Sequence, residues 1–260
     1  MSVLTSEWLK VRSLRSTYLV LGLALSAIFM GLALAVMAAG MYDTASLAQR
    51  SRARIADLEE VLVMVPQLCM GILGALTITS EYTTGSIRTS LTLVPGRWPV
   101  LAAKSLIVGA LGLIVGALTV FGTYFLSREV LGDRFAGAYT TPFQDRLPLL
   151  LALSLTVPVF ALLGTAFGAL LRSAAGAIAV IVGLVYVIPM IIGKIPEPSS
   201  ERLGSLMIGA LPREITGDTI TTSVYGSLLS PAAAAMVMVA YAILPLIAAT
   251  WLVRRRDAWP

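Results

Sequence analysis

The charged residues whose types and spacing most clearly suggest a function lie in residues 80–104. This segment lies between two long apolar runs. Glu81 and Arg88 supply opposite charges there, and three apolar side chains lie between or beside them: Tyr82, Ile87 and Leu91. A short helix with apolar anchors and charges fits a groove on a partner protein. The pattern is therefore suited to a docking site on a partner protein. The alternative interpretation is that both charges are simply solvated in a loop.

The residue types required by several catalytic and metal-binding mechanisms are absent or rare. The chain has no His, and Cys69 is its one cysteine, which excludes a His-based triad, a zinc site with several Cys or His ligands, and an intrachain disulfide. It also lacks the G-x-x-x-x-G-K-[ST] pattern of a P-loop. We expect no enzyme activity, no catalytic residue, no metal site and no cofactor bound by this chain.

The composition is that of a membrane protein. Of 260 residues, 57% are hydrophobic and 13% are charged, and the mean hydropathy is +0.88. Soluble domains contain about 25% charged residues, so a soluble enzyme, a disordered chain and a coiled coil are excluded. The net charge of +5 is interpreted as a topology and lipid-contact signal, and no nucleic-acid partner is expected.

Six apolar runs are long enough for helices that cross a bilayer core of about 30 Å. The sequence predicts an all-α polytopic protein, with residues 1–260 forming a single transmembrane domain. The predicted spans are Thr17–Ala39, Val61–Thr79, Val100–Leu126, Leu147–Leu171, Ala174–Ile192 and Pro231–Val253.

Six spans place both termini on one side of the membrane. Segments 1–16, 80–104 and 254–260 share that side, and their basic residues are denser than those of the longer opposite segments. All four tryptophans, residues that prefer the membrane interface, also fall on or near it. We expect this side to be cytoplasmic, with 194–230 as an extracellular loop.

Charged residues are scarce within these runs. Only Lys104 carries a charge, and no run contains Asp, Glu or His. Ion-coupled carriers place such residues along their pathway, so a proton relay is not expected. Two GxxxG pairs, Gly112/Gly116 and Gly164/Gly168, predict close approach of neighbouring helices.

Three polar segments between the runs have their own patterns. Ser2–Ser16 predicts an amphipathic interfacial helix with Leu4, Trp8 and Val11 on its apolar face; the alternative is a frayed basic tail. Residues 41–60 predict a solvated helix that extends the first or second span, and no function is assigned to it. In 194–230, one short helix is predicted with an apolar face at Leu203, Leu206, Met207, Ala210 and Leu211, ended by Pro212 and Gly217.

The order of several motifs resembles the membrane subunit of ABC-2-type ATP-binding-cassette transporters. The pattern Glu-x-x-x-Gly-Ser/Thr, then Pro-x-Arg, then Lys is present at Glu81, Gly85, Ser86, Pro95, Arg97 and Lys104. The opening residues 6–16 are also similar to bacterial permeases of this family. The resemblance covers essentially the whole chain, and Ser86 stands where Thr is commoner.

The resemblance implies roles for these positions. Residues 1–16 would form an elbow helix, and Glu81–Leu93, within the 80–99 coupling loop, would be a coupling helix docked on a separate P-loop ATPase subunit. The implied coupling residues are Glu81, Tyr82, Gly85, Ser86, Ile87 and Arg88. Glu81 would pair with a basic residue or cap the coupling helix. Trp8, Arg97, Trp98 and Lys104 are predicted to anchor the chain at the lipid headgroups.

The implied function is a permease subunit of an exporter in the bacterial cell membrane. A second, identical or different, permease subunit would complete the substrate pathway, with ATP and Mg in the ATPase partner. The lack of buried charge favours an amphiphilic or apolar cargo, such as a drug, an antimicrobial peptide or a lipid-like molecule. A non-transporting scaffold or sensor that recruits a cytoplasmic partner uses the same docking loop and remains an alternative.

Overall fold

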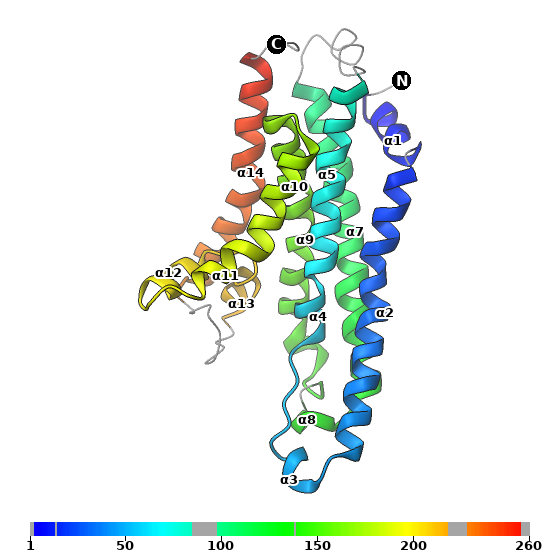
Figure 1. The fold of residues 1–260 in the computed structure, drawn as a ribbon, viewed down its shortest axis with the longest axis vertical. Coiled ribbons are helices and arrows are strands. Elements are labelled where there is room, and N and C mark those ends of the chain that lie inside the picture. Colours follow the sequence, from blue (N-terminus) through cyan, green and yellow to red (C-terminus); the bar gives the residue numbers. More distant parts are fainter. Residues whose placement is uncertain (1–2, 14, 85–97, 138, 218–227, 256–260) are drawn as a thin grey trace.

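The protein is helical throughout the part of the chain that can be described. The computed structural model describes residues 3–13, 15–84, 98–137, 139–217 and 228–255, and every regular element in these ranges is a helix. The prediction of an all-α protein is confirmed. Figure 1 shows an elongated bundle with the N- and C-termini at the same end, which we call the terminal end; the opposite end is the far end.

All six predicted spans are present as helices. Among the described residues, six helices are long and apolar enough to cross a membrane: Arg15–Thr44, Leu58–Tyr82, Trp98–Leu131, Phe143–Leu171, Ala174–Ile192 and Pro231–Val253. The first four are longer than their apolar runs. At 1.5 Å per residue, the 34 residues of α7 (Trp98–Leu131) extend for about 51 Å, so this helix continues well beyond a bilayer core of about 30 Å.

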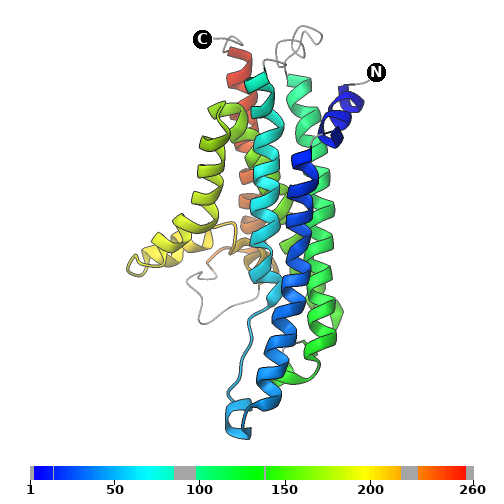
Figure 2. The ribbon, with the colours of Figure 1, turned by 45° about the vertical axis from the view of Figure 1, so that its right-hand side comes forward.

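Four helices form the core of the bundle. They are α2 (Arg15–Thr44), α5 (Met64–Thr84), α7 and α9 (Phe143–Leu171). α9 packs most extensively on α5 and then on α7, while α2 packs on α7. Their long parallel courses are visible in two views (Figures 1 and 2).

Close glycine contacts explain how tightly α9 packs. A Cβ atom added at Gly164 would lie 1.9 Å from the carbonyl oxygen of Gly71 on α5. One added at Gly116 of α7 would lie 2.5 Å from the carbonyl oxygen of Ser154 on α9. Small residues allow helix backbones to approach this closely in lipid. The predicted packing role of both GxxxG pairs is confirmed.

The fifth span is bent. It consists of α10 (Ala174–Val182), the π-helical segment η1 (Gly183–Val187) and α11 (Ile188–Ile192). A π-helical turn and a proline are two recognised causes of helix bending, and Pro189 lies two residues after the end of η1. Figure 1 shows the chain turning away from α9 here, toward α12 (Ser199–Ser205).

The last span stands beside α9 and is otherwise little covered. α14 (Pro231–Arg255) packs on α9 and on the short helix α13 (Leu211–Thr216). Many of its side chains are exposed, including Met236, Ile247 and Trp251. Such a surface is suited to lipid or to another membrane-embedded chain.

Two predicted connecting segments differ from the structure. Residues 41–60 are not one solvated helix: α3 (Leu47–Arg50) and α4 (Leu58–Leu62) are separated by irregular chain, and Glu59 on α4 is buried. The single helix predicted around Leu203–Leu211 is two helices, α12 and α13. Pro212 is the second residue of α13 rather than the end of a helix, because proline is well tolerated in a first helical turn.

The predicted N-terminal helix is present, and one of its charged residues lies on the buried face. α1 (Val3–Ser13) buries Glu7 and Val11, while Leu4 and Trp8 are 45% and 44% exposed. The buried face of α1 therefore combines the apolar Val11 with the ion-paired Glu7. At the far end, the short helix α8 (Arg134–Gly137) lies near α2, and Arg134 pairs there with Asp43.

Candidate functional site: a buried charge network at the terminal end

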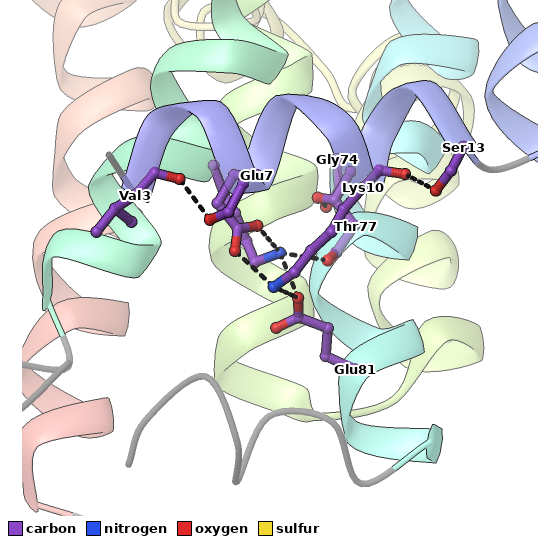
Figure 3. A network of polar contacts seen from close by, with 9 residues as sticks. Val3, Glu7, Lys10, Ser13, Gly74, Thr77 and Glu81 are labelled. Atoms are coloured by element: carbon purple, nitrogen blue, oxygen red, sulfur yellow. Dashed lines mark hydrogen bonds and ion pairs between the residues drawn. The ribbon is translucent and has the colours of Figure 1, made fainter. Parts of the chain in front are cut away.

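Four charged residues meet where α1 crosses the bundle. We call them the Lys104 network: Glu7 and Lys10 on α1, Glu81 on α5 and Lys104 on α7. Figure 3 shows α1 passing over the ends of the longer helices, with the side chains of Glu7 and Lys10 directed toward Glu81. Glu7 and Lys10 are three positions apart, so they share a face of α1.

Each lysine of the network bridges both carboxylates. The Lys104 Nζ atom lies 2.5 Å from Glu7 Oε2 and 2.8 Å from Glu81 Oε1. It also donates a hydrogen bond of 3.1 Å to the backbone carbonyl of Thr77. The Lys10 Nζ atom lies 2.6 Å from Glu7 Oε1 and 2.8 Å from Glu81 Oε1. Two positive and two negative groups thus balance one another.

The network is largely closed to its surroundings. The side chains of Glu7, Lys104 and Glu81 are 2%, 5% and 8% exposed, whereas that of Lys10 is 41% exposed. Burial lowers the pKa of Lys10, but hydrogen bonds to Glu7 and Glu81 outweigh it, so the pKa of Lys10 is raised. The Lys10 ammonium therefore stays charged at neutral pH and covers the buried carboxylates.

This arrangement ties three helices together at one point. Removing one partner of a buried ion pair leaves an uncompensated charge and costs about 3–5 kcal/mol. A displacement of the end of α5 must therefore carry α1 and α7 with it or break these pairs. The geometry thus connects α1, α5 and α7 mechanically at the terminal end.

The structure describes only part of the predicted coupling segment. Glu81 lies on α5, which continues to Thr84, five residues past the predicted end of span two. The expectation that Glu81 pairs with a basic residue is confirmed. Gly85, Ser86, Ile87, Arg88 and Arg97 lie outside the described residues, as does most of the predicted Glu81–Leu93 helix.

Tyr82 is half-buried within the chain itself. Its ring packs beside the cluster formed by Ile78, Leu101 and Ala166, and the Arg172 guanidinium lies 5.3 Å from the ring centroid. Arg172 ends α9 in a left-handed conformation with φ 52°. Tyr82 thus connects the end of span two to the turn between spans four and five.

Of the predicted headgroup anchors, Trp8 and Trp98 are 44% and 52% exposed at the terminal end. Lys104 does not reach the headgroups, contrary to the prediction. Its ammonium is buried because two carboxylates and a carbonyl surround it.

A second set of charges lies near the start of span two. We call it the Arg213 cluster: Asp57, Glu60, Arg146 and Arg213. Arg213 on α13 donates from Nη2 to Asp57 Oδ2 at 2.7 Å and from Nε to Glu60 Oε1 at 2.9 Å. Arg146 on α9 donates to Asp57 Oδ2 at 3.1 Å. The cluster therefore holds the loop helix α13 against spans two and four.

Glu59 lies beside this cluster but faces a different group. The Tyr139 hydroxyl donates to Glu59 Oε2 at 3.0 Å and accepts a hydrogen bond from the Leu58 backbone N–H at 2.8 Å. Burial and the nearby Glu59 raise the pKa of Tyr139, so the hydroxyl keeps its proton. The Arg213 pKa is also raised: burial lowers it, but the contacts to Glu60 and Asp57 outweigh that effect.

Sequence reasoning missed Glu7, Asp57, Glu60, Arg146 and Arg213. It also treated the spans as free of acidic residues, which holds only for their central parts because span two has Glu59 and Glu60 at one end and Glu81 at the other. One signal was available. A single Lys104 in an apolar run needs a partner, but its partner Glu7 lies 97 positions away.

Comparison of the chain with protein-family models and with curated proteins gave no match. The fold and the six candidate spans define a multi-pass membrane protein.

Proposed function

We propose that the chain is the permease subunit of an ATP-driven ABC-2-type exporter in the bacterial cell membrane. Its terminal end would be cytoplasmic and would dock on a separate P-loop ATPase subunit, with ATP and Mg bound there. A second permease subunit would complete the pathway for a drug, an antimicrobial peptide or a lipid-like cargo. The motif resemblance and the six-span architecture support this proposal.

The observation that carries it is the Lys104 network. Glu81, the first residue of the implied coupling helix, is joined to α7 by a buried ion pair with Lys104 and to α1 by a partly buried ion pair with Lys10. A coupling helix needs such a connection, because force from an ATPase must reach the spans as a rigid-body displacement. In this proposal α1 is the elbow helix, and it moves together with the ends of spans two and three.

A pull-down from native membranes in mild detergent tests the proposal. We expect a stoichiometric soluble P-loop ATPase to co-purify with the tagged chain. A second, different permease in the same preparation would identify a heterodimer. Stable preparations without an ATPase in several detergents would overturn the proposal and favour a scaffold that recruits another cytoplasmic partner.

Cysteine labelling tests the proposed orientation. The native Cys69 is buried, so it provides a silent background. Ser13→Cys on α1 and Ser199→Cys on α12 introduce thiols at exposed positions. An impermeant maleimide added to whole cells should label position 199 and spare position 13. The reverse pattern would invert the orientation.

A further inference from the structure

A pocket of about 700 Å³ lies at the start of span two, beside the Arg213 cluster. Its lining comes from spans two, four and five and from the chain around α13, and most of the lining side chains are apolar. Among them are Val61, Met64, Phe160, Leu184, Val185 and Ile208. Ligand sites in proteins have volumes of about 300–1,000 Å³ and mostly apolar walls with few polar groups. The pocket has the size and lining of a small-molecule site.

The bend of the fifth span forms one wall of this pocket. Leu184 and Val185 of η1 line it, together with Pro189 of α11, and they face Leu153 and Phe160 of α9 across it. Figure 1 shows the chain turning away from α9 in this region. π-helical turns are frequent at functional sites. The irregular part of the fifth span therefore contributes directly to the pocket.

The charged side chains in the lining are paired with one another or with a neighbour. Both carboxylate oxygens of Glu60 accept hydrogen bonds from Arg213, and Asp57 is paired with Arg213 and Arg146. Among the described residues at this end of the pocket, two acids and two arginines thus balance. An ion that entered would lose its hydration without gaining an unpaired opposite charge, which is unfavourable. The pocket therefore favours an uncharged ligand over an ion of either sign.

Gln67 supplies a polar atom that has no partner among the described residues. Its side chain lines the pocket and is 5% exposed. The Nε2 atom donates to Thr156 Oγ1 at 2.7 Å, and the Thr156 hydroxyl donates its own proton to the Leu153 carbonyl at 2.6 Å. Because this hydroxyl has only one proton, it must accept from the amide, which fixes the orientation of Gln67. The Oε1 atom is left as an acceptor for a ligand.

A hydrogen-bond donor on the ligand would satisfy this acceptor. A polar atom held in an apolar site loses free energy when it has neither water nor a protein partner. A hydroxyl group provides the donor without adding a charge. The chemistry of the lining therefore specifies both an apolar body and one uncharged polar group.

We propose that this pocket binds an uncharged, largely apolar molecule whose hydroxyl group donates a hydrogen bond to Gln67 Oε1. The apolar body would lie between η1 and α9. Binding requires neither an ATPase nor transport, so the inference goes beyond the proposed function and can be tested on the isolated chain.

Three probes that share a triphenyl body test the preference for an uncharged ligand. They are triphenylmethanol, the methyltriphenylphosphonium cation and the triphenylacetate anion. The purified full-length chain in lipid nanodiscs is dialysed to equilibrium against each probe, and protein-free nanodiscs measure partitioning into lipid. We expect saturable binding of the alcohol and at least about tenfold weaker binding of both ions. Protein-dependent binding of either ion as tight as that of the alcohol, or no saturable binding of the alcohol, would overturn the proposal.

Gln67→Leu tests the hydrogen bond. It removes the acceptor and keeps an apolar side chain of similar size, while the Thr156 hydroxyl retains its bond to Leu153. Binding of triphenylmethanol should weaken about three- to tenfold, whereas binding of triphenylmethane, which has no hydroxyl, should not weaken. Gln49→Leu is the matched control, because Gln49 is exposed on α3 and lies outside the lining. Equal effects of Gln67→Leu on the two probes would refute the role of Gln67.

Leu184→Trp tests the location independently of the amide. The larger ring should fill the space beside η1 and weaken binding of triphenylmethanol at least about tenfold. This variant decides the location if Gln67→Leu does not fold. Wild-type affinity in Leu184→Trp would show that the alcohol binds elsewhere.

Discussion

The Lys104 network and the Arg213 cluster are both formed by two basic and two acidic side chains, yet they differ in burial. In the Lys104 network three of the four side chains are at most 8% exposed, whereas those of the Arg213 cluster are 12–25% exposed. Burial makes an ion pair costly to break, and partial exposure keeps charge accessible. The first arrangement suits rigid coupling between helices, and the second suits reversible contact between loops.

Lys104→Met is expected to have the largest effect. It leaves Glu7 and part of the Glu81 charge buried without their main partner, so the chain should lose about 3–5 kcal/mol of stability. The change in unfolding temperature is measured on the purified protein. Samples are heated, and size-exclusion chromatography then gives the fraction that remains folded.

A double variant separates lost charge balance from lost packing. Lys104→Met combined with Glu81→Gln leaves one acidic and one basic residue, Glu7 and Lys10, in the network. It should be more stable than Lys104→Met alone, because fewer buried charges lack partners. Equal or lower stability of the double variant would show that the lysine acts through its packing.

Gly164→Ala tests whether the tight contact between α5 and α9 stabilises the bundle. Its new methyl group would collide with the Gly71 carbonyl oxygen, so the helices must separate, at a cost of about 1–3 kcal/mol. Gly22→Ala is the control, since nothing lies within 4 Å of an added Cβ there. Similar melting of the two variants would contradict the close packing.

Arg213→Gln should have a smaller effect. The side chain is 19% exposed, so its ion pairs are intermediate between surface and buried pairs, and we expect a loss of about 1–2 kcal/mol. Hydrogen exchange should increase in α13 and at the start of span two while remaining unchanged around Lys104. Faster exchange at the terminal end would show that the two charged regions are not independent.

Asp43→Asn should change stability least. The Asp43–Arg134 pair is exposed at the far end, where solvent screens its charges. Melting at low and high salt should match that of the wild-type chain. A marked loss of stability would show that breaking an exposed ion pair can cost as much as breaking a buried one.

The sequence allowed the six spans to be predicted because each is a long apolar run that a bilayer requires. The ends of the spans were harder to predict. Three charged residues look like loop residues in the sequence: Glu59, Glu81 and Arg146. The helices include them because each has a partner elsewhere in the same chain.

Both charged regions depend on contacts distant in the sequence. Glu7 meets Lys104, and Asp57 meets Arg213, 156 positions away. Local periodicity carries no information about such pairs, so it could not show that Glu7 lies on the buried face of α1. Glu81 was identified by its motif, and a charged residue next to an apolar run suggested a partner without indicating which one.

ATP hydrolysis by the purified complex tests the central claim most directly. The chain is co-purified with the ATPase subunit that we propose as its partner, reconstituted in lipid and compared with the Lys104→Met/Glu81→Gln double variant, with Asp43→Asn as the control. If the Lys104 network couples the two subunits, the double variant should retain the bound ATPase but lose most cargo-stimulated hydrolysis, while the control remains at wild-type level. Normal stimulation in the double variant would show that coupling does not pass through this network.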